Sequence, residues 1–448
     1  MRAQLFRTLV ALCVISLLHT PGAGAQTAAP TNVKYLDNGR IRLGIDLNLG
    51  GAITYISLSG SSINLINSFD WGRQIQMSNY SGPVPFVPNG KPPRPDWAGL
   101  GWNPIQSGDC YGNRSKVTLF KNNGKEMVVR CIPMQWPLNN EPGECEFECR
   151  LSLDGYTVKV SSALFNHRSD KTQWAARDQE LPAVYTNGPW YKLVTYTGDA
   201  PFTSGTLTYP PVQFPWTGWN ATENWAALID EKGFGLGIYE PGIIHFIGGF
   251  AGKPGSGGPK DSPTGYIAPL HVEILDYNIT YRYSYTLIVG SLENIRSWVY
   301  AHHDASALPD YRFFTDRQHW HYANAVDEGW PIHGELKVSL AQNNPQLIGP
   351  QALWHAEKAP VIHLLASFPA EIKRLRIFWT RSDSPQFNET CVLTFPVNGD
   401  RDYHDYSFKL SSSEQYRGVV TGVRIDPETI GLPGIYAGVK RIWLDDKD

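Results

Sequence analysis

Side chains able to hold a sugar are concentrated in residues 64–113. Guanidinium, amide and carboxylate groups make paired hydrogen bonds to adjacent hydroxyls, and indole faces cover the C–H side of a pyranose ring. Polar loops of this length are functional more often than structural. The stretch supplies six candidates: Arg73, Gln76, Trp102, Asn103, Gln106 and Asp109. The alternative is a surface cover, in which a segment such as residues 81–96, with its six prolines, merely packs its aromatics.

Acidic residues are the next requirement, because cleavage of a glycosidic bond needs one protonated and one ionised carboxyl group. Four acids lie in suitable contexts: Asp109, Asp178, Glu180 and Glu240. Aromatic neighbours would raise the pKa of Glu180, whereas backbone N–H groups of a glycine- and asparagine-rich loop would keep Asp109 charged. We therefore expect Glu180 to transfer the proton and Asp109 to be its ionised partner. A salt bridge or a turn cap is the alternative for each acid.

The neighbours of Glu180 supply further candidates. Tyr185 is expected to support catalysis by orienting the substrate, and Trp190 and Glu240 are expected to help bind it. On a uronic-acid polymer the roles would change, since Arg73 would neutralise the substrate carboxylate and Tyr185 would act as acid or base in β-elimination. A non-catalytic glycan-binding or cell-surface protein is the third alternative. We expect a poly- or oligosaccharide partner in each case.

Metal and cofactor chemistry receives little support. His319 and His321 are two residues apart, a spacing at which two imidazoles on one strand face can share a metal ion. Histidines in connecting segments usually face solvent, however. The glycine-rich residues 253–263 lack the Gly-Lys-Ser/Thr ending of a phosphate-binding loop and are expected to be a lid near the site. No metal and no other cofactor is therefore expected.

The cysteines predict a disulfide framework. Loss of Cys13 with a leader leaves an odd number, which allows two bridges at most. We expect both among Cys110, Cys131, Cys145 and Cys149, with Cys391 as a buried thiol. A zinc cluster is the alternative for the four, but their spacing lacks the paired Cys-x-x-Cys of common zinc sites.

Charge and the N-terminal pattern narrow the partners and the location. A net charge of -3 with no basic run excludes the electrostatic footprint of a nucleic-acid binder. Residues 1–25 combine Arg2 and Arg7, an apolar core over residues 9–18 and the small residues Ala23-Gly24-Ala25, the pattern of a signal peptide. We expect a secreted or extracytoplasmic protein. Since no later stretch reaches roughly 20 apolar residues, we expect no membrane insertion.

Alternating apolar and polar residues indicate an all-β chain. Antiparallel strands are expected at residues 40–47, 51–58, 127–132, 145–151, 156–164, 225–229, 235–239, 243–246, 271–275 and 279–289. A helix over residues 291–301, with Ser291 as its N-cap, would close this domain. Strands resume at residues 374–380, 390–395, 403–410, 419–425 and 439–444. The expected organisation is a signal peptide (1–25), a β-supersandwich (26–300), a connector (301–328) and a β-sandwich or jelly roll (329–448).

Two sequence patterns carry a resemblance to known families. DNGRIRLGIDLNLGGAITYIS (residues 37–57) and NLINSFDWGRQIQMSNYSGP (residues 64–83) resemble secreted carbohydrate-active proteins of the galactose-mutarotase-like supersandwich. The later segments RLRIFWT, YHDYSFKL, YRGVVTGVRIDP and RIWLD resemble jelly-roll carbohydrate-binding modules of the galactose-binding type. The resemblance implies a carbohydrate-active protein, which we expect to be a glycoside hydrolase. The sequence departs from aldose epimerases, because neither His167 nor His245 has a context that matches their catalytic histidine pair.

Overall fold

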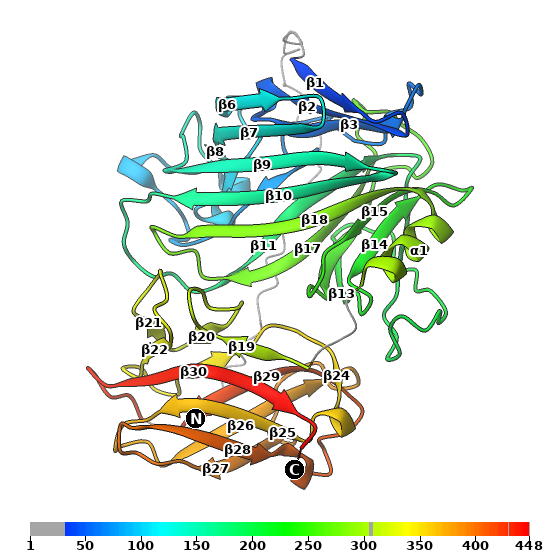
Figure 1. Cartoon of the computed structure of the whole chain (residues 1–448). Coiled ribbons are helices and arrows are strands. Elements are labelled where there is room, and N and C mark those ends of the chain that lie inside the picture. The colour runs from blue at the N-terminus through cyan, green and yellow to red at the C-terminus, as the bar shows by residue number, and fades with distance from the viewer. Residues whose placement is uncertain (1–31, 304–307, 429, 448) are drawn as a thin grey trace.

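The computed structural model describes residues 32–303, 308–428 and 430–447. The expected signal peptide lies outside the described residues. The regular secondary structure of the described chain consists mainly of antiparallel strands, which form two units, one above the other in Figure 1. The predicted all-β class is confirmed, with a large double-sheet unit followed by a smaller β-sandwich.

Two large sheets form the first unit. The ten-stranded sheet has the spatial order β1 (Val33–Asp37), β2 (Ile41–Asp46), β3 (Ala52–Leu58), β4 (Ile75–Ser78), β11 (Arg177–Asn187), β17 (Thr264–Glu273), β16 (His245–Ala251) and β13 (Thr217–Asn220). In addition, β5 (Pro104–Ile105) pairs with β4, and β8 (Met134–Gln135) pairs with β5. The eight-stranded sheet has the order β12 (Lys192–Thr195), β14 (Trp225–Ile229), β15 (Phe234–Tyr239), β18 (Thr280–Ser291), β10 (Thr157–Asn166), β9 (Cys145–Asp154), β7 (Glu126–Ile132) and β6 (Lys116–Asn122).

Two sheets of six strands form the second unit. One contains β21 (Val326–Asp327), β22 (Leu336–Ser339), β30 (Tyr436–Asp445), β25 (Val361–Ser367) and β28 (Tyr403–Lys409), with β19 (Asp310–Arg312) paired to β30. The other contains β20 (His321–Ala323), β23 (Gln346–Ile348), β29 (Val419–Pro427), β26 (Arg374–Arg381) and β27 (Val392–Pro396), with β24 (Trp354–His355) paired to β29. Strands β19, β20 and β21 lie in the segment expected to be a connector, and they pair with this C-terminal sandwich.

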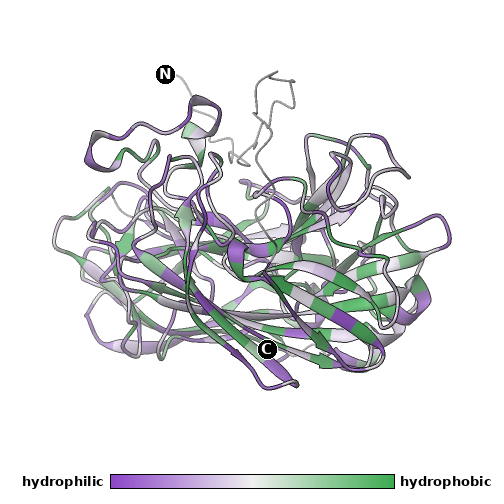
Figure 2. Cartoon of the chain, turned by 90° about the horizontal axis from the view of Figure 1, so that it is seen from above, coloured by the Kyte–Doolittle hydropathy of each residue, from purple (hydrophilic) through white to green (hydrophobic). Residues whose placement is uncertain are grey.

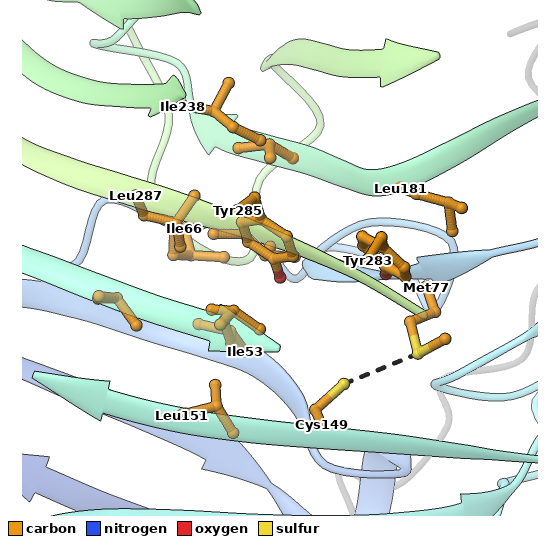
Figure 3. Packing of buried hydrophobic residues seen from close by; sticks show 14 of the residues in the cluster. Ile53, Ile66, Met77, Cys149, Leu151, Leu181, Ile238, Tyr283, Tyr285 and Leu287 are labelled. Atoms are coloured by element: carbon orange, nitrogen blue, oxygen red, sulfur yellow. Dashed lines mark hydrogen bonds between the residues drawn. The ribbon is translucent and has the colours of Figure 1, made fainter. Parts of the chain in front are cut away.

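Period-two alternation produces the core between the large sheets. Along β18, Tyr281, Tyr283 and Tyr285 are buried, while the intervening Arg282 and Ser284 are exposed. Figure 2 shows the resulting mixture of hydrophobic and hydrophilic residues along the strands. Figure 3 shows Tyr283, Tyr285 and their aliphatic neighbours packed between strands of the two sheets.

Helical structure is sparse among the described residues. The α-helix α1 (Leu292–His302) begins where the sequence predicts it, and the Ser291 hydroxyl accepts a hydrogen bond from the Asn294 backbone N–H at 3.2 Å. Nowhere in the described part of the chain is a helix both long and apolar enough to span a membrane. Short 3-10 turns are η1 (Leu47–Leu49), η2 (Pro88–Gly90), η3 (Pro95–Leu100), η4 (Ala356–Lys358) and η5 (Leu410–Ser412).

The expected disulfides are wrong. All five described cysteines are free thiols, and the zinc alternative fails too, because these cysteines form no metal-binding cluster in the described chain. Cys149 lies opposite Val129 in β7, whereas Cys131 lies opposite Phe147 in β9, so the strand register separates the two thiols. The Cys149 sulfur instead lies 3.7 Å from the Met77 sulfur (Figure 3). Cys131, Cys145 and Cys149 are instead part of the hydrophobic core of the first unit, and Cys110 is partly buried.

A buried ionic network joins the two units. The Arg317 guanidinium lies 2.6 Å from both Asp276 and Asp327. Asp276 belongs to the first unit, and Asp327 to the C-terminal sandwich. The Gln173 amide donates to Asp276 at 3.1 Å and to Asp327 at 2.6 Å. Arg317, Asp276 and Asp327 are all buried, so separating the two units would leave buried charges unpaired. The ion pairs therefore favour one relative placement of the two units.

Candidate functional site

Strand β11 presents two different faces. Gln179 and Leu181 are fully buried toward the eight-stranded sheet, so Asp178 and Glu180 point to the opposite side and are partly exposed. Glu180 lies opposite Ser78 of β4 and Leu270 of β17. An irregularity between Glu180 and Val184 shifts the register.

The same side carries a row of aromatic rings. Beyond the shift, Tyr185 pairs with Tyr266 of β17, and their rings lie 4.8 Å apart. Trp216 lies 5.0 Å from the Tyr266 ring. A Cβ atom at Gly249 of β16 would come within 3.1 Å of the Trp216 ring and 2.3 Å of the Gln213 carbonyl oxygen, so glycine permits this close approach. We call the surface formed by Asp178, Glu180, Tyr185, Tyr266 and Trp216 the outer-face site.

Glu180 has the chemistry of a proton-transferring group. Burial raises the pKa of the Glu180 carboxyl to about 7, hydrogen bonds from the Tyr266 and Tyr80 hydroxyls oppose the rise, and the negative charge of Asp178 adds to it. The Gln179 amide positions Tyr80, because its oxygen accepts from the Tyr80 N–H at 2.7 Å and its NH₂ donates to the Tyr80 carbonyl at 2.8 Å. A carboxyl that titrates near neutral pH is suited to general acid–base catalysis.

Two histidines, His245 and His321, lie close enough to Asp178 to interact with its charge. Burial lowers the pKa of His245, at the start of β16, and the Asp178 charge opposes this shift. Burial also lowers the pKa of His321, which comes from β20 of the C-terminal sandwich, while the charges of Glu273 and Asp178 oppose the shift. The His245 Nδ1 atom is buried and lacks a hydrogen-bond partner in the described chain. Both imidazoles are therefore neutral near pH 7.

The polar stretch 64–113 contributes scaffolding rather than exposed ligands. The Gln76 oxygen accepts from the Ser107 N–H at 3.0 Å, and the Gln106 oxygen accepts from the Met77 N–H at 3.2 Å. The Asn103 amide donates to the Asn79 carbonyl at 2.9 Å. All three side chains are buried. The amide groups of these side chains therefore form the hydrogen bonds that buried backbone groups of the loop require.

The remaining binding candidates are also placed in the interior. Trp102 and Trp190 belong to the main hydrophobic core. Arg73 donates to the Ser262 carbonyl and pairs with Asp70 at 3.2 Å, which ties the glycine-rich loop 253–263 to the stretch before β4. Glu240 is buried beside His271. Of the expected site residues, the structure brings Glu180 and Tyr185 together on the outer-face site.

Asp109 organises a turn. One carboxylate oxygen accepts from the backbone N–H groups of Tyr111 and Asn113, each at 2.9 Å. The other accepts from the Asn113 amide at 2.8 Å and from the Asn140 N–H at 2.7 Å. With its side chain buried and both oxygens occupied in this way, Asp109 offers no free carboxylate oxygen to a substrate.

We expect Asp109→Ala to lower the free energy of unfolding by about 2–4 kcal/mol, because four hydrogen bonds to a buried charged group are lost. Urea denaturation measures the change. Asp96→Ala is the matched control, since Asp96 is an exposed aspartate of the same polar stretch. A loss of less than about 0.5 kcal/mol for Asp109→Ala would contradict the structural role.

Comparison with known proteins yields solved structures of low sequence identity. No family model matches the sequence, and no curated protein is found to be similar to it. Among solved structures, a galactose mutarotase related enzyme from Lactobacillus acidophilus is 10% identical with a TM-score of 0.33, over 58% of this chain and 97% of that one. A galactose mutarotase-like protein from Lactobacillus casei ATCC 334 is 10% identical with a TM-score of 0.38, over 57% and 99%. The Slr1438 protein from Synechocystis sp. PCC 6803 is 11% identical with a TM-score of 0.36, over 60% and 99%.

Sequence reasoning missed several residues around Glu180. The local sequence of His245 does not mark it as a site residue, and no motif marks Tyr266 or Trp216. The available signal was strand alternation, because His245 and Ile247 share a face of β16 opposite to the fully buried Phe246. His321 was weighed only as a metal ligand, since nothing in its local sequence indicates that β20 approaches Asp178.

Proposed function

We propose that this protein is a glycoside hydrolase that binds a poly- or oligosaccharide at the outer-face site. Glu180 would be the protonated acid and Asp178 its ionised partner, in place of Asp109. The observation that carries the proposal is Glu180, whose pKa is raised to about 7, on the same strand face as Asp178 and beside a row of aromatic rings.

The spacing of the two acids suits hydrolysis. Residues two apart on a strand face the same side and lie roughly 7 Å apart along it. Glycosidases hold their two carboxyl groups about 5–10 Å apart. The negative charge of Asp178 also raises the pKa of Glu180, which favours the protonated form of the Glu180 carboxyl. The partly exposed rings of Tyr185 and Trp216 offer apolar faces to the C–H side of a sugar ring, and the buried Tyr266 ring supports them.

Cleavage by β-elimination has one observation in its favour. His245 and His321, whose pKa values are lowered, are neutral imidazoles near Asp178 and can accept a proton. Elimination also requires a cation that neutralises the substrate carboxylate. Arg73 is engaged with Asp70 and Ser262, and Arg177 donates to the Leu100 carbonyl at 2.6 Å. Hydrolysis therefore fits the outer-face site better.

The reaction products distinguish the alternatives. We expect the purified chain to release reducing ends from at least one neutral member of a glycan panel, without the ultraviolet absorbance of an unsaturated product. Unsaturated products from uronic-acid polymers would instead show a lyase. Binding without cleavage of any glycan would show a non-catalytic binder, and either result would overturn the hydrolase proposal. The pattern of residues 1–25 supports action outside the cytoplasm.

A further inference from the structure

A second cluster of ionisable side chains lies on the inner side of β17. His271 and Glu273 are two residues apart, and both point away from the outer-face site toward the eight-stranded sheet. His319 reaches them from the segment before β20, at the junction with the C-terminal sandwich. One ligand atom from each of the three residues lies within 4.8 Å of the other two.

Glu240 lies beside this cluster and contacts His271. Its side chain comes from the end of β15, and the residue is only 3% exposed. One carboxylate oxygen lies 3.0 Å from the His271 Nε2 atom. The other carboxylate oxygen is buried without a hydrogen-bond partner in the described residues. Such a group is costly to bury unless something binds it.

The hydrogen bonds around His271 define its tautomer. The Tyr281 hydroxyl donates to Glu273 at 2.9 Å, so it must accept from the His271 Nδ1 atom 2.8 Å away. Nδ1 then carries the proton of a neutral imidazole, and Nε2 presents its lone pair toward Glu240. Metal-bound histidines are oriented in this way, by a hydrogen bond from the nitrogen that does not bind the ion.

The donor set suits a divalent transition metal. Two imidazoles and two carboxylates match the ligands of Zn²⁺, and the two negative charges would balance the ion. Ca²⁺ and Mg²⁺ prefer oxygen ligands alone, so the imidazoles disfavour them. We propose that His271, His319, Glu273 and Glu240 bind one Zn²⁺ ion that fastens the C-terminal sandwich to the first unit. This proposal does not depend on the reaction at the outer-face site.

The test uses the untagged full-length chain, stripped with a chelator and then titrated with ZnCl₂. We expect one equivalent of Zn²⁺ by calorimetry and by elemental analysis, with a rise in Tm of at least about 3 °C. His319→Ala should lower the affinity at least about tenfold, and its 44% exposed side chain makes the substitution tolerable for folding. His321→Ala is the matched control from the same segment and should keep the wild-type affinity.

Two results would overturn the metal site. One is the absence of stoichiometric Zn²⁺ binding to the wild type. The other is equal affinity of the wild type and His319→Ala. If His319→Ala misfolds, the Zn²⁺ affinity of Glu240→Gln is the second test. This substitution removes a charged ligand but preserves the shape of the side chain, and it should also lower the affinity.

Discussion

Replacing Glu180 with glutamine is expected to lower turnover at least about a hundredfold while leaving glycan binding intact. Glutamine keeps the size and polarity of the side chain but cannot transfer the proton. In the wild type, activity should fall as pH rises through about 7, because the acid form of Glu180, whose pKa is raised to about 7, is then lost. Initial rates and binding isotherms between pH 5 and 9 measure both effects.

Glu231→Gln is the control for this substitution. Glu231 is an exposed glutamate of the same unit, paired with Lys192, and its replacement should change turnover less than twofold. Unchanged turnover in a correctly folded Glu180→Gln protein would remove Glu180 from the mechanism.

Glu180→Gln should raise the stability of the protein, although it lowers turnover. The folded-state pKa of Glu180, about 7, exceeds the ordinary value of 4.5, so the folded wild type binds its proton more tightly than the unfolded chain does. This contribution to stability is complete below pH 4.5 and is lost as pH rises toward 7. We expect Glu180→Gln to be more stable than the wild type by about 1–3 kcal/mol at pH 8. Equal stabilities at pH 8 would show that the carboxyl is not destabilised by burial.

Replacement of Arg317 with methionine should have the largest effect on stability. It leaves Asp276 and Asp327 as buried carboxylates without their cation, which costs about 3–5 kcal/mol. The urea midpoint, followed by tryptophan fluorescence, should fall accordingly. Arg312→Met is the matched control, because Arg312 forms an exposed ion pair with Asp310 and should change stability by less than about 1 kcal/mol. Similar losses in both variants would show that the network does not join the units.

The strands were predictable because their signal is local. Alternation along residues 279–289 reflects the tyrosines that β18 buries, and Ser291 caps α1 through a contact three residues away. The same locality explains why Glu180 and Tyr185 were found together, since both lie on β11. Short-range patterns therefore carry the fold class and one strand of the candidate site.

The rest of the site depends on contacts that no local pattern encodes. Tyr266 approaches Glu180, and His245 approaches Asp178, because β11 is paired with β17 and β17 with β16, two strands that come much later in the sequence than β11. The buried amides of Gln76 and Gln106 have the same composition as a sugar-binding loop, but they bind backbone groups. Composition alone cannot separate these two uses of an amide. The free cysteines make the same point, because a shared core and a disulfide framework both place cysteines close together in a sequence.

The C-terminal sandwich places His321 near Asp178 of the first unit, and this contact limits how such a chain can evolve. His321 comes from the sandwich, and Arg317 is buried against carboxylates of both units. A recombination event that exchanged this sandwich for another β-sandwich would leave Asp276 without its cation and the surroundings of Asp178 without one imidazole. Gene shuffling is therefore expected to transmit the two units as one inherited block, unlike appended modules that are freely exchanged between enzymes.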